Sequence, residues 1–417
     1  MSPQALSERL NILFQQARWT EARQLLESYL ADYPEDELAR LYYINVLINS
    51  GEKKLARELI GPLLEESPDN PLVLRLAAVV ELNDQKPKVA ERLAGILIEQ
   101  DPEDDDSYVL MARAKLDQRN YDAALTNLEY ALDRNPENQE ALNLKIYVGG
   151  FLGREDTQRA IDEALYLNPE DSTTIANHGY QLLRQGQVDA ALERLRHALS
   201  INPTDQLARY AMLEAMRARF WPYRLYFKYQ EAMAKLSGGA SMGVIIGLWL
   251  AVNFLSRVAE ENPGYGLFLW PVVYLCFALF LLTWIIEPIM NFYLLTNRYG
   301  RLLLDEDQKL MARLVGGSLG LAGLSLLAYF ATGAFLFQAL AFAFLLFTIP
   351  LGSFLRPIRK TQRTILTLYT VGLGVFGLGS IFLDSGTLGN IALFGLLAYQ
   401  FVINGMMVRE GGRTFGE

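Results

Sequence analysis

The chain has 417 residues and a formal net charge of −9, and its charged residues are spread unevenly. Residues 1–216 hold 22 Lys and Arg against 37 Asp and Glu, residues 217–235 hold five against one, and residues 236–417 hold 11 against nine within long apolar runs. An acidic domain repels a phosphate backbone, which argues against nucleic acid as a partner. The one cysteine, Cys276, cannot form an intramolecular disulfide, and no group of His, Cys and carboxylates has metal-ligand spacing, so we expect no metal or other cofactor.

The first residues, MSPQALSERL, lack the basic and apolar regions that a signal peptide would have. The N-terminal half of the chain is built from an internal repeat. Prolines recur at intervals of 33 or 34 residues, and a ladder of alanines has the same spacing over four units and resumes in the sixth. Two registered ladders over six units indicate a repeat of about 34 residues. The ladders are Pro34, Pro68, Pro102, Pro136, Pro169 and Pro203, and Ala22, Ala56, Ala90, Ala124 and Ala191.

Each unit is predicted to form two helices, as residues 103–136 illustrate. The first helix begins in an acidic stretch, which suits the positive end of a helix dipole. A polar turn at residues 117–120 separates it from the second helix, which ends before Pro136 because proline clashes with a continuing helix. We expect Ala112 and Ala124 to face each other where the two helices cross closely.

This pattern resembles the tetratricopeptide-repeat (TPR) family over residues 4–216. The family has a small residue at the eighth position of each unit, alanine at the twentieth and twenty-seventh, and proline at the thirty-second. The fourth unit matches with Ala112, Ala124, Ala131 and Pro136, and the sixth with Gly179, Ala191, Ala198 and Pro203. Three units depart from the pattern: Leu10 and Ile44 replace the small residue, Tyr29 and Leu63 replace the second alanine, and Thr157 stands on the alanine ladder.

The resemblance implies a right-handed superhelix whose first helices line a concave groove, with residues 204–217 as a capping helix. The family's groove position would fall on Asn11, Asn45, Val79, Arg113, Lys145 and Tyr180, which we interpret as a surface for a protein partner. Each residue alone has the alternative role of a solvated helix face. Asn11 and Asn45 fit part of the set that clamps acidic chaperone tails, but Leu72 and Leu76 stand where that clamp needs basic residues, so no chaperone clamp is predicted.

Residues 218–238 form a collar in which aromatic and basic side chains interleave. Aromatic rings with a polar edge favour the lipid headgroup layer, and basic residues favour anionic lipid. The alternative, which is compatible with the first, is that the aromatic rings pack beneath the array as a second cap. The residues predicted at the membrane interface are Trp221, Tyr223, Arg224, Tyr226 and Lys228.

The remaining chain is predicted to be a membrane bundle of about six helices in three hairpins, at residues 239–410, so that the whole chain is all-α and the array ends at residue 217. The apolar runs are 241–258, 267–287, 312–331, 333–350, 364–383 and 388–408, each near the roughly 20 residues that cross a bilayer. Fifteen Lys and Arg lie on one side of the apolar runs and only Arg257 on the other, which places the array and both termini in the cytoplasm, at a bacterial inner membrane.

A long loop joins the second and third apolar runs. In this loop we expect an interfacial helix at residues 291–295, a turn at residues 297–301 and a helix start at Asp305.

The sequence contains no sign of catalysis. No charged residue lies in the middle of an apolar run, and no phosphate loop or nucleophile motif is present, so we do not expect an enzyme. Three functions remain: a scaffold that brings a protein to the membrane, a non-catalytic subunit of a larger membrane complex, and a transporter or membrane enzyme with the repeats as a regulatory domain.

Overall fold

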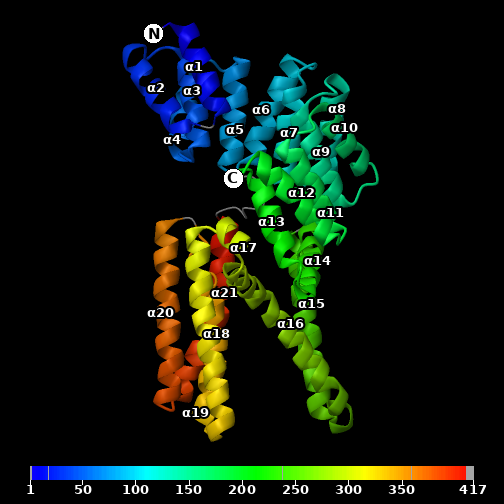
Figure 1. Cartoon of the computed structure of the whole chain (residues 1–417), viewed down its shortest axis with the longest axis vertical. Helices are drawn as coiled ribbons and strands as arrows, with labels where there is room; N and C mark the ends of the chain where they lie inside the picture. Colours follow the sequence, from blue (N-terminus) through cyan, green and yellow to red (C-terminus); the bar gives the residue numbers. More distant parts are fainter. Residues whose placement is uncertain (1, 17, 237, 358, 410–417) are drawn as a thin grey trace. The chain divides into compact units, whose positions relative to one another are not determined.

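The computed structural model describes residues 2–16, 18–236, 238–357 and 359–409, and within these ranges it contains helices and no strands. The chain divides into two compact units, residues 1–174 and residues 175–417 (Figure 1). Each unit is described by itself. The division falls within the first helix of the sixth repeat, at residues 174 and 175, so the boundary predicted at residue 217 stays a prediction about where the repeats end.

The first unit is a series of helix pairs that follow the predicted repeat. Its helices are α1 (Pro3–Gln15), α2 (Trp19–Asp32), α3 (Glu37–Asn49), α4 (Lys53–Glu66), α5 (Pro71–Asn83), α6 (Pro87–Gln100), α7 (Asp105–Asp117), α8 (Tyr121–Arg134), α9 (Gln139–Leu152) and α10 (Thr157–Leu167). Every second helix ends two residues before its ladder proline. Asp36, Asn70 and Asn138 cap the first helices of three units by accepting a backbone N–H.

The predicted close crossing of the two helices is confirmed in the fourth unit. Ala112 and Ala124 are completely buried in one apolar cluster with Leu128 and Ala131. Larger side chains take the second alanine position in the first two units, where Tyr29 and Leu63 are also buried. The departures from the family pattern therefore alter the packing of these units without removing the helix pair.

The second unit begins with the last helices of the array and continues into the apolar part of the chain. Its helices are α11 (Ser172–Arg184, with its first three residues in the first unit), α12 (Val188–Ile201), α13 (Gln206–Arg217), α14 (Trp221–Lys235), α15 (Gly238–Glu261), α16 (Pro263–Thr296), α17 (Arg298–Leu303), α18 (Glu306–Thr332), α19 (Phe335–Leu351), α20 (Lys360–Phe382) and α21 (Gly386–Arg409). Helices α15 and α16, α18 and α19, and α20 and α21 pack pairwise, as expected for three hairpins.

The loop between the second and third apolar runs differs from the prediction at two of three points. Residues 291–295 are not a separate interfacial helix but continue α16 to Thr296. The predicted turn at residues 297–301 is wrong, because Asn297 accepts backbone N–H groups of Tyr299 and Gly300 and starts the short helix α17. The helix start at Asp305 is confirmed by a capping box with Gln308.

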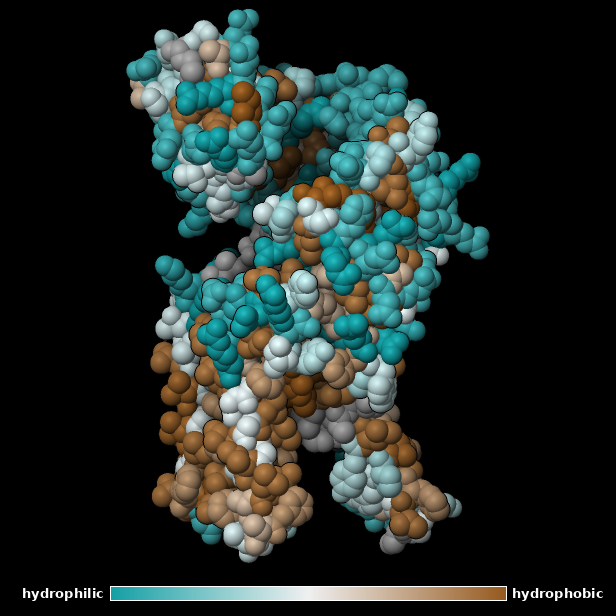
Figure 2. Space-filling model, viewed as in Figure 1, coloured by the Kyte–Doolittle hydropathy of each residue, from teal (hydrophilic) through white to brown (hydrophobic). Residues whose placement is uncertain are grey.

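Among the residues that the structure describes, three helices of the second unit are long and apolar enough to cross a membrane, namely Glu306–Thr332, Lys360–Phe382 and Gly386–Met406. Gly264–Cys276 and Phe335–Leu351 are apolar but shorter. Large apolar side chains are exposed on these helices, among them Leu327, Phe330 and Phe401, and Figure 2 shows this apolar surface over α18 and α20. These features indicate a membrane protein, and the six predicted spans stay a prediction.

Candidate interaction surfaces

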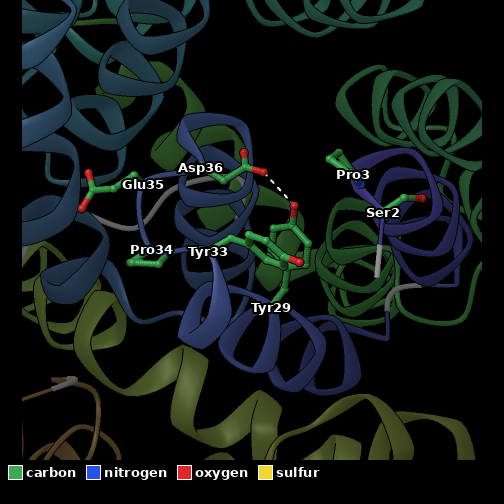
Figure 3. A pocket seen from close by; sticks show the side chains of 7 residues that line it. All are labelled: Ser2, Pro3, Tyr29, Tyr33, Pro34, Glu35 and Asp36. Atoms are coloured by element: carbon green, nitrogen blue, oxygen red, sulfur yellow. Dashed lines mark hydrogen bonds between the residues drawn. The ribbon is translucent and has the colours of Figure 1, made fainter.

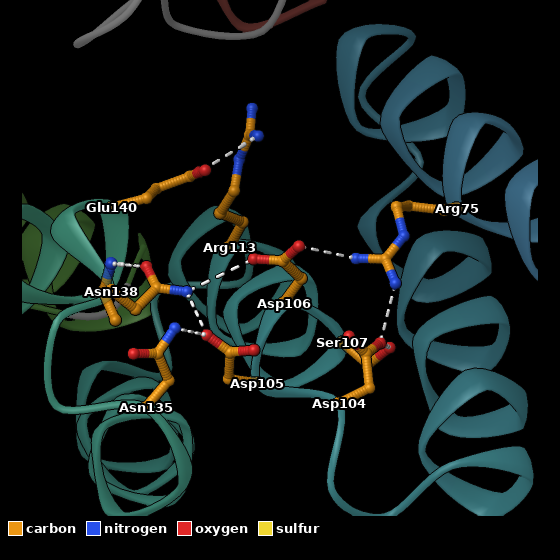
Figure 4. A network of polar contacts seen from close by, with 10 residues as sticks. Arg75, Asp104, Asp105, Asp106, Ser107, Arg113, Asn135, Asn138 and Glu140 are labelled. Atoms are coloured by element: carbon orange, nitrogen blue, oxygen red, sulfur yellow. Dashed lines mark hydrogen bonds and ion pairs between the residues drawn. The ribbon is translucent and has the colours of Figure 1, made fainter.

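A network of polar contacts joins the first helices of the third, fourth and fifth units (Figure 4). Arg75 of α5 pairs with Asp104 at 2.8 Å and with Asp106 at 3.1 Å, and Arg113 of α7 pairs with Glu140 of α9 at 3.4 Å. Each pair links one unit to the next. These contacts fix the spacing of neighbouring first helices, and therefore the shape of the surface that they share.

Asp105 lies in the same network and receives two amide donors. Its carboxylate accepts hydrogen bonds from Asn135 at 2.8 Å and Asn138 at 2.7 Å. Burial works to raise the pKa of Asp105, but the two amides outweigh it and hold the pKa below its usual range. The start of α7 therefore keeps its negative charge, which the helix dipole also favours.

Three predicted groove residues lie on the first unit with accessible side chains. Asn11 is exposed on α1, and Asn45 is partly exposed on α3, where its side-chain oxygen accepts a hydrogen bond from Asn49 at 2.7 Å. Arg113 is partly exposed on α7 and forms an ion pair with Glu140. Val79 is half-buried and packs against the apolar cluster of the neighbouring helices. A partner that uses Arg113 must therefore compete with Glu140.

Lys145 lies on α9, the first helix of the fifth unit. At Gly149 of the same helix, a Cβ atom would lie 2.8 Å from Oγ1 of Thr157 of α10. Lys145 lies one turn before Gly149, on the same face of α9, and lines a cleft of about 630 Å³ with α8 and the start of α10.

Tyr180 is also placed differently from an open groove position, because α14 covers it. Its side chain is only 1% exposed. The Tyr180 ring meets Phe227 of α14 edge to face, with centroids 6.2 Å apart, and its hydroxyl donates to Glu231 at 3.3 Å. Arg184 forms an ion pair with the same carboxylate at 3.1 Å and lies 4.4 Å from the centroid of the Tyr180 ring. Direct contact of Tyr180 with a partner would require α14 to move.

The capping helix α13 is buried by the helices that follow it in the chain, and this was not predicted. All side chains from Ala211 to Ala218 are buried. Phe220, just after α13, packs edge to face on Tyr293 of α16, and Arg209 donates to the backbone of Leu303 in α17. The last helix of the array is therefore an interior element of the second unit and not a solvent-facing cap.

A buried polar cluster, which we call the junction network, holds α13, α14 and α16 together. Its members are Glu214, Arg217, Tyr223 and Asn291, all at most 6% exposed. Arg217 donates to Glu214 at 2.5 Å and to the side chain of Asn291 at 2.7 Å, and the Tyr223 hydroxyl donates to Glu214 at 2.8 Å. Breaking such a buried pair by removing one partner costs about 3–5 kcal/mol.

The electrostatics of the junction network follow from its burial. Burial raises the pKa of Glu214, and Arg217 and the Tyr223 hydroxyl oppose this shift only in part. Burial works to lower the pKa of Arg217, but the attraction of Glu214 outweighs it and raises that pKa. Arg217 therefore stays charged, and its guanidinium bonds both Glu214 of its own helix and Asn291 of α16.

The predicted interfacial residues of the collar divide between the two faces of α14. Trp221 is 70% exposed, and Arg224 and Lys228 are also exposed. Tyr223 is buried in the junction network, and Tyr226 is half-buried and accepts a hydrogen bond from Gln230. The predicted alternative, in which aromatic rings pack beneath the array, therefore describes Tyr223, while Trp221, Arg224 and Lys228 remain available to a lipid surface or a partner.

A shallow pocket of about 640 Å³ lies at the start of the chain, between the first residues of α1 and the turn from α2 to α3 (Figure 3). Tyr29 and Tyr33 lie in contact there, with ring centroids 4.9 Å apart. The Tyr29 hydroxyl donates to Asp36 at 2.9 Å. Within the residues that the structure describes, no group of three or more His, Cys, Asp and Glu could hold a metal ion.

Comparisons with known proteins address the repeat directly. Residues 13–80 and residues 109–171 match family descriptions of the tetratricopeptide repeat. The N-terminal segment is a TPR array. A comparison with curated proteins gives no match.

Solved structures of TPR proteins are similar to this array. A thermophilic TPR protein from Thermus thermophilus is 22% identical, with 43% of this chain and 98% of that chain covered and a TM-score of 0.40. A TPR protein from Parabacteroides merdae is 16% identical, with 51% and 83% covered and a TM-score of 0.45. YrrB, described as a TPR protein with an unusual peptide-binding site, is 19% identical, with 45% and 96% covered and a TM-score of 0.31.

The junction network was missed by reasoning from family positions. The repeat pattern assigns residues to faces of a unit, but the junction network joins side chains up to 77 residues apart in sequence, from Glu214 to Asn291. One signal was available in advance. Arg217 and Glu214 lie three residues apart near the end of a helix that was expected to be a polar cap, next to a stretch with six aromatic residues at 220–229.

Proposed function

We propose that the chain is a membrane-anchored TPR scaffold that recruits or organises a protein partner at the cytoplasmic face of a membrane, without catalysis. The TPR array supports the interaction role, because such arrays present extended surfaces made from many units. The three apolar helices support the anchor, and the excess of Lys and Arg on one side of the apolar runs supports the orientation.

The observation that carries the proposal is the burial of α13. A flexible tether between array and anchor needs only a polar linker. Instead, Arg217 of α13 bonds Asn291 of α16, and α13 contacts both α16 and α17. A partner held by the last units of the array would thereby be held in a defined position on the anchoring helices. This is the property expected of a scaffold that organises its partner.

The partner surface proposed in the first unit is the row of first helices with Asn11, Asn45 and Arg113. These side chains are polar and accessible, and they come from three separate units. The network of Arg75, Asp104 and Asp106 holds the neighbouring helices in register beside them. The surface carries both basic and acidic side chains. This favours a partner with polar and charged side chains over an apolar one.

The test is recovery of co-purifying proteins from membranes solubilised in mild detergent. The intact protein is compared with the variant Asn11→Ala, Asn45→Ala and Arg113→Ala. Each change at such a surface should alter the free energy of unfolding by only about 0.5 kcal/mol, so the variant should fold and insert. The matched control is Gln158→Ala with Arg159→Ala, which removes polar side chains from an exposed face of a second helix, α10.

We expect at least one protein to be recovered with the intact chain and with the control, and to be lost with the groove variant. Equal recovery with the groove variant would show that the first-helix surface is not the binding site. Proteins retained in that case would favour the alternative of a subunit in a larger membrane complex, whose contacts lie on the exposed apolar faces of α18 and α20.

A further inference from the structure

The helix α14 presents one carboxylate to the array. Glu231 is the only acidic residue between residues 217 and 235, a stretch that also holds five basic residues. One of its oxygens accepts a hydrogen bond from the Tyr180 hydroxyl at 3.3 Å, and the other forms an ion pair with Nε of Arg184 at 3.1 Å. Both donors come from α11, the first helix of the sixth repeat. A lone acidic residue on a basic helix is therefore the one that faces the array.

The surroundings of this carboxylate are largely shielded from water. The Arg184 side chain is 9% exposed and that of Glu231 is 19% exposed. The Tyr180 ring lies beneath the guanidinium, and Phe227, one turn before Glu231, closes the side. A charge-assisted hydrogen bond in such a place is stronger than one on the surface, and the aromatic ring adds a cation–π contact. These are the features of a site built to hold a carboxylate.

We propose that Tyr180 and Arg184 form a carboxylate-binding site of the TPR groove, that the chain's own Glu231 occupies this site, and that an acidic side chain of a bound peptide competes with Glu231 for it. The proposal rests on the proposed function, in which the array binds a protein partner. Gly179 supports this placement, because a Cβ atom there would lie 2.7 Å from Leu195, which makes Gly179 the small residue of the unit and Tyr180 the groove residue that follows it.

Self-occupation sets a threshold for the partner. A tethered group has an effective concentration near the millimolar range, so a competing acidic peptide binds more weakly than it would to an empty site. Because α14 leads directly into α15, release of Glu231 would also loosen α14 from α11. By linkage, whatever stabilises α14 against the array weakens peptide binding by the same factor. The site would thereby couple the partner to the membrane half.

The experiment measures the binding of a fluorescent hexaglutamate peptide to the full-length protein in detergent by anisotropy. The variant Glu231→Gln keeps the shape of the side chain and removes its charge. We expect it to bind hexaglutamate about tenfold more tightly than the natural chain does, which corresponds to about 1.4 kcal/mol. Adding Arg184→Gln to Glu231→Gln should abolish the gain, and a hexaglutamine peptide should show no gain in any variant.

The matched control is Glu193→Gln, which removes the same charge from an exposed position of α12. It should bind hexaglutamate as the natural chain does. A second readout is hydrogen exchange at residues 221–235, which should become faster when hexaglutamate binds. If Glu231→Gln disturbs folding, as judged by circular dichroism, Glu231→Asp replaces it and should show a smaller gain in the same direction.

Equal affinity of the natural chain, Glu231→Gln and Glu193→Gln for hexaglutamate would overturn the proposal and leave Glu231 as a structural contact of α14. A gain that survives Arg184→Gln would do the same, because it would reflect charge alone. Neither result bears on the scaffold proposal, which depends on recovery of a partner through Asn11, Asn45 and Arg113.

Discussion

Gly149 marks the place where a single residue sets the geometry of a repeat. The fifth unit lacks alanine on the ladder and has Thr157 there, so a small residue is needed on the opposite helix. Gly149 of α9 supplies it, with Thr157 directly against it. Sequence reasoning could identify the irregular unit, but not which of the following residues compensates, because that depends on how far α9 extends before Gly153 ends it.

We predict that Gly149→Ala destabilises the protein and that Thr157→Ala restores it. The new Cβ would lie 2.8 Å from Thr157 Oγ1, and overpacking of this kind costs about 1–3 kcal/mol. The double variant recreates the Ala–Ala crossing of the fourth unit. Gly61→Ala is the control, because nothing lies within 4 Å of its Cβ position and alanine favours a helix. Thermal unfolding followed by circular dichroism gives the comparison, and a Gly149→Ala midpoint equal to that of the natural chain would refute the crossing.

Asp171 gives a pH-dependent prediction. Its Oδ2 accepts hydrogen bonds from the Thr174 backbone and hydroxyl, at 2.9 and 2.6 Å, and from Asn143 at 2.9 Å. Burial works to raise the pKa of Asp171, but these donors outweigh it and lower the pKa. A lowered folded pKa means that the carboxylate contributes stability above its unfolded pKa of about 3.9, and that this contribution is lost as the pH falls through the folded pKa.

Asp171→Asn should therefore lower stability at pH 7 by about 1 kcal/mol, since the amide still offers one acceptor oxygen. The difference from the natural chain should shrink as the pH falls below about 4. Thermal unfolding at pH 7 and at pH 3.5 measures it, with Asp156→Asn, an exposed aspartate, as the control. A difference that grows in acid would show that the hydrogen bonds do not favour the ionised form.

At the scale of elements, α13 determines where the array can be separated from the rest of the chain. The repeat pattern suggests a cut after residue 217, where the units end. In the structure, that cut removes the cover of Met212, Leu213 and Met216 and leaves Glu214 and Arg217 without Tyr223 and Asn291. The sequence predicts that α13 is a helix but not what it packs against, because its partners are tens of residues away.

We predict that a fragment of residues 1–217 is helical but self-associates in the absence of detergent. The newly exposed apolar face of α13 is the cause. The same fragment with Met212→Gln and Met216→Gln should associate less, because the exposed face becomes polar. Size-exclusion chromatography with light scattering separates the cases. A monodisperse monomer from the unmodified fragment would mean that α13 is stable as a solvent-facing cap and that its burial is not required.

The helices of the membrane half show which of their features a sequence can predict. On α18, a neighbouring side chain packs closely at Gly316, whose Cβ position would lie 2.1 Å from the ring of Phe292. Gly320 has no atom within 4 Å of its Cβ position. The spacing of small residues predicts which face of a helix packs against a neighbour, but not how far along that face the neighbouring helix extends. The same reason explains why the continuation of α16 to Thr296 was missed.

At the scale of the whole molecule, the chain combines a TPR array with a membrane half. The array was predictable in detail, because 34-residue periodicity records its local geometry six times over. The helices of the membrane half were predictable only in outline. The length of an apolar run indicates the length of a helix, but not which other helices it packs against. The contacts that join α13 to α16 were not predictable, because each depends on one pair of side chains and no repetition reinforces it.

The central claim is that the array is held at the cytoplasmic face by helices that cross the membrane. The measurement uses single cysteines and a membrane-impermeant maleimide on intact cells, in a Cys276→Ser background. Thr387→Cys lies at the start of α21, and Ser200→Cys lies at the end of α12 in the array. The account predicts that Thr387→Cys is labelled in intact cells and that Ser200→Cys is labelled only after the cells are permeabilised. Labelling of Ser200→Cys in intact cells, with protection of Thr387→Cys, would contradict it.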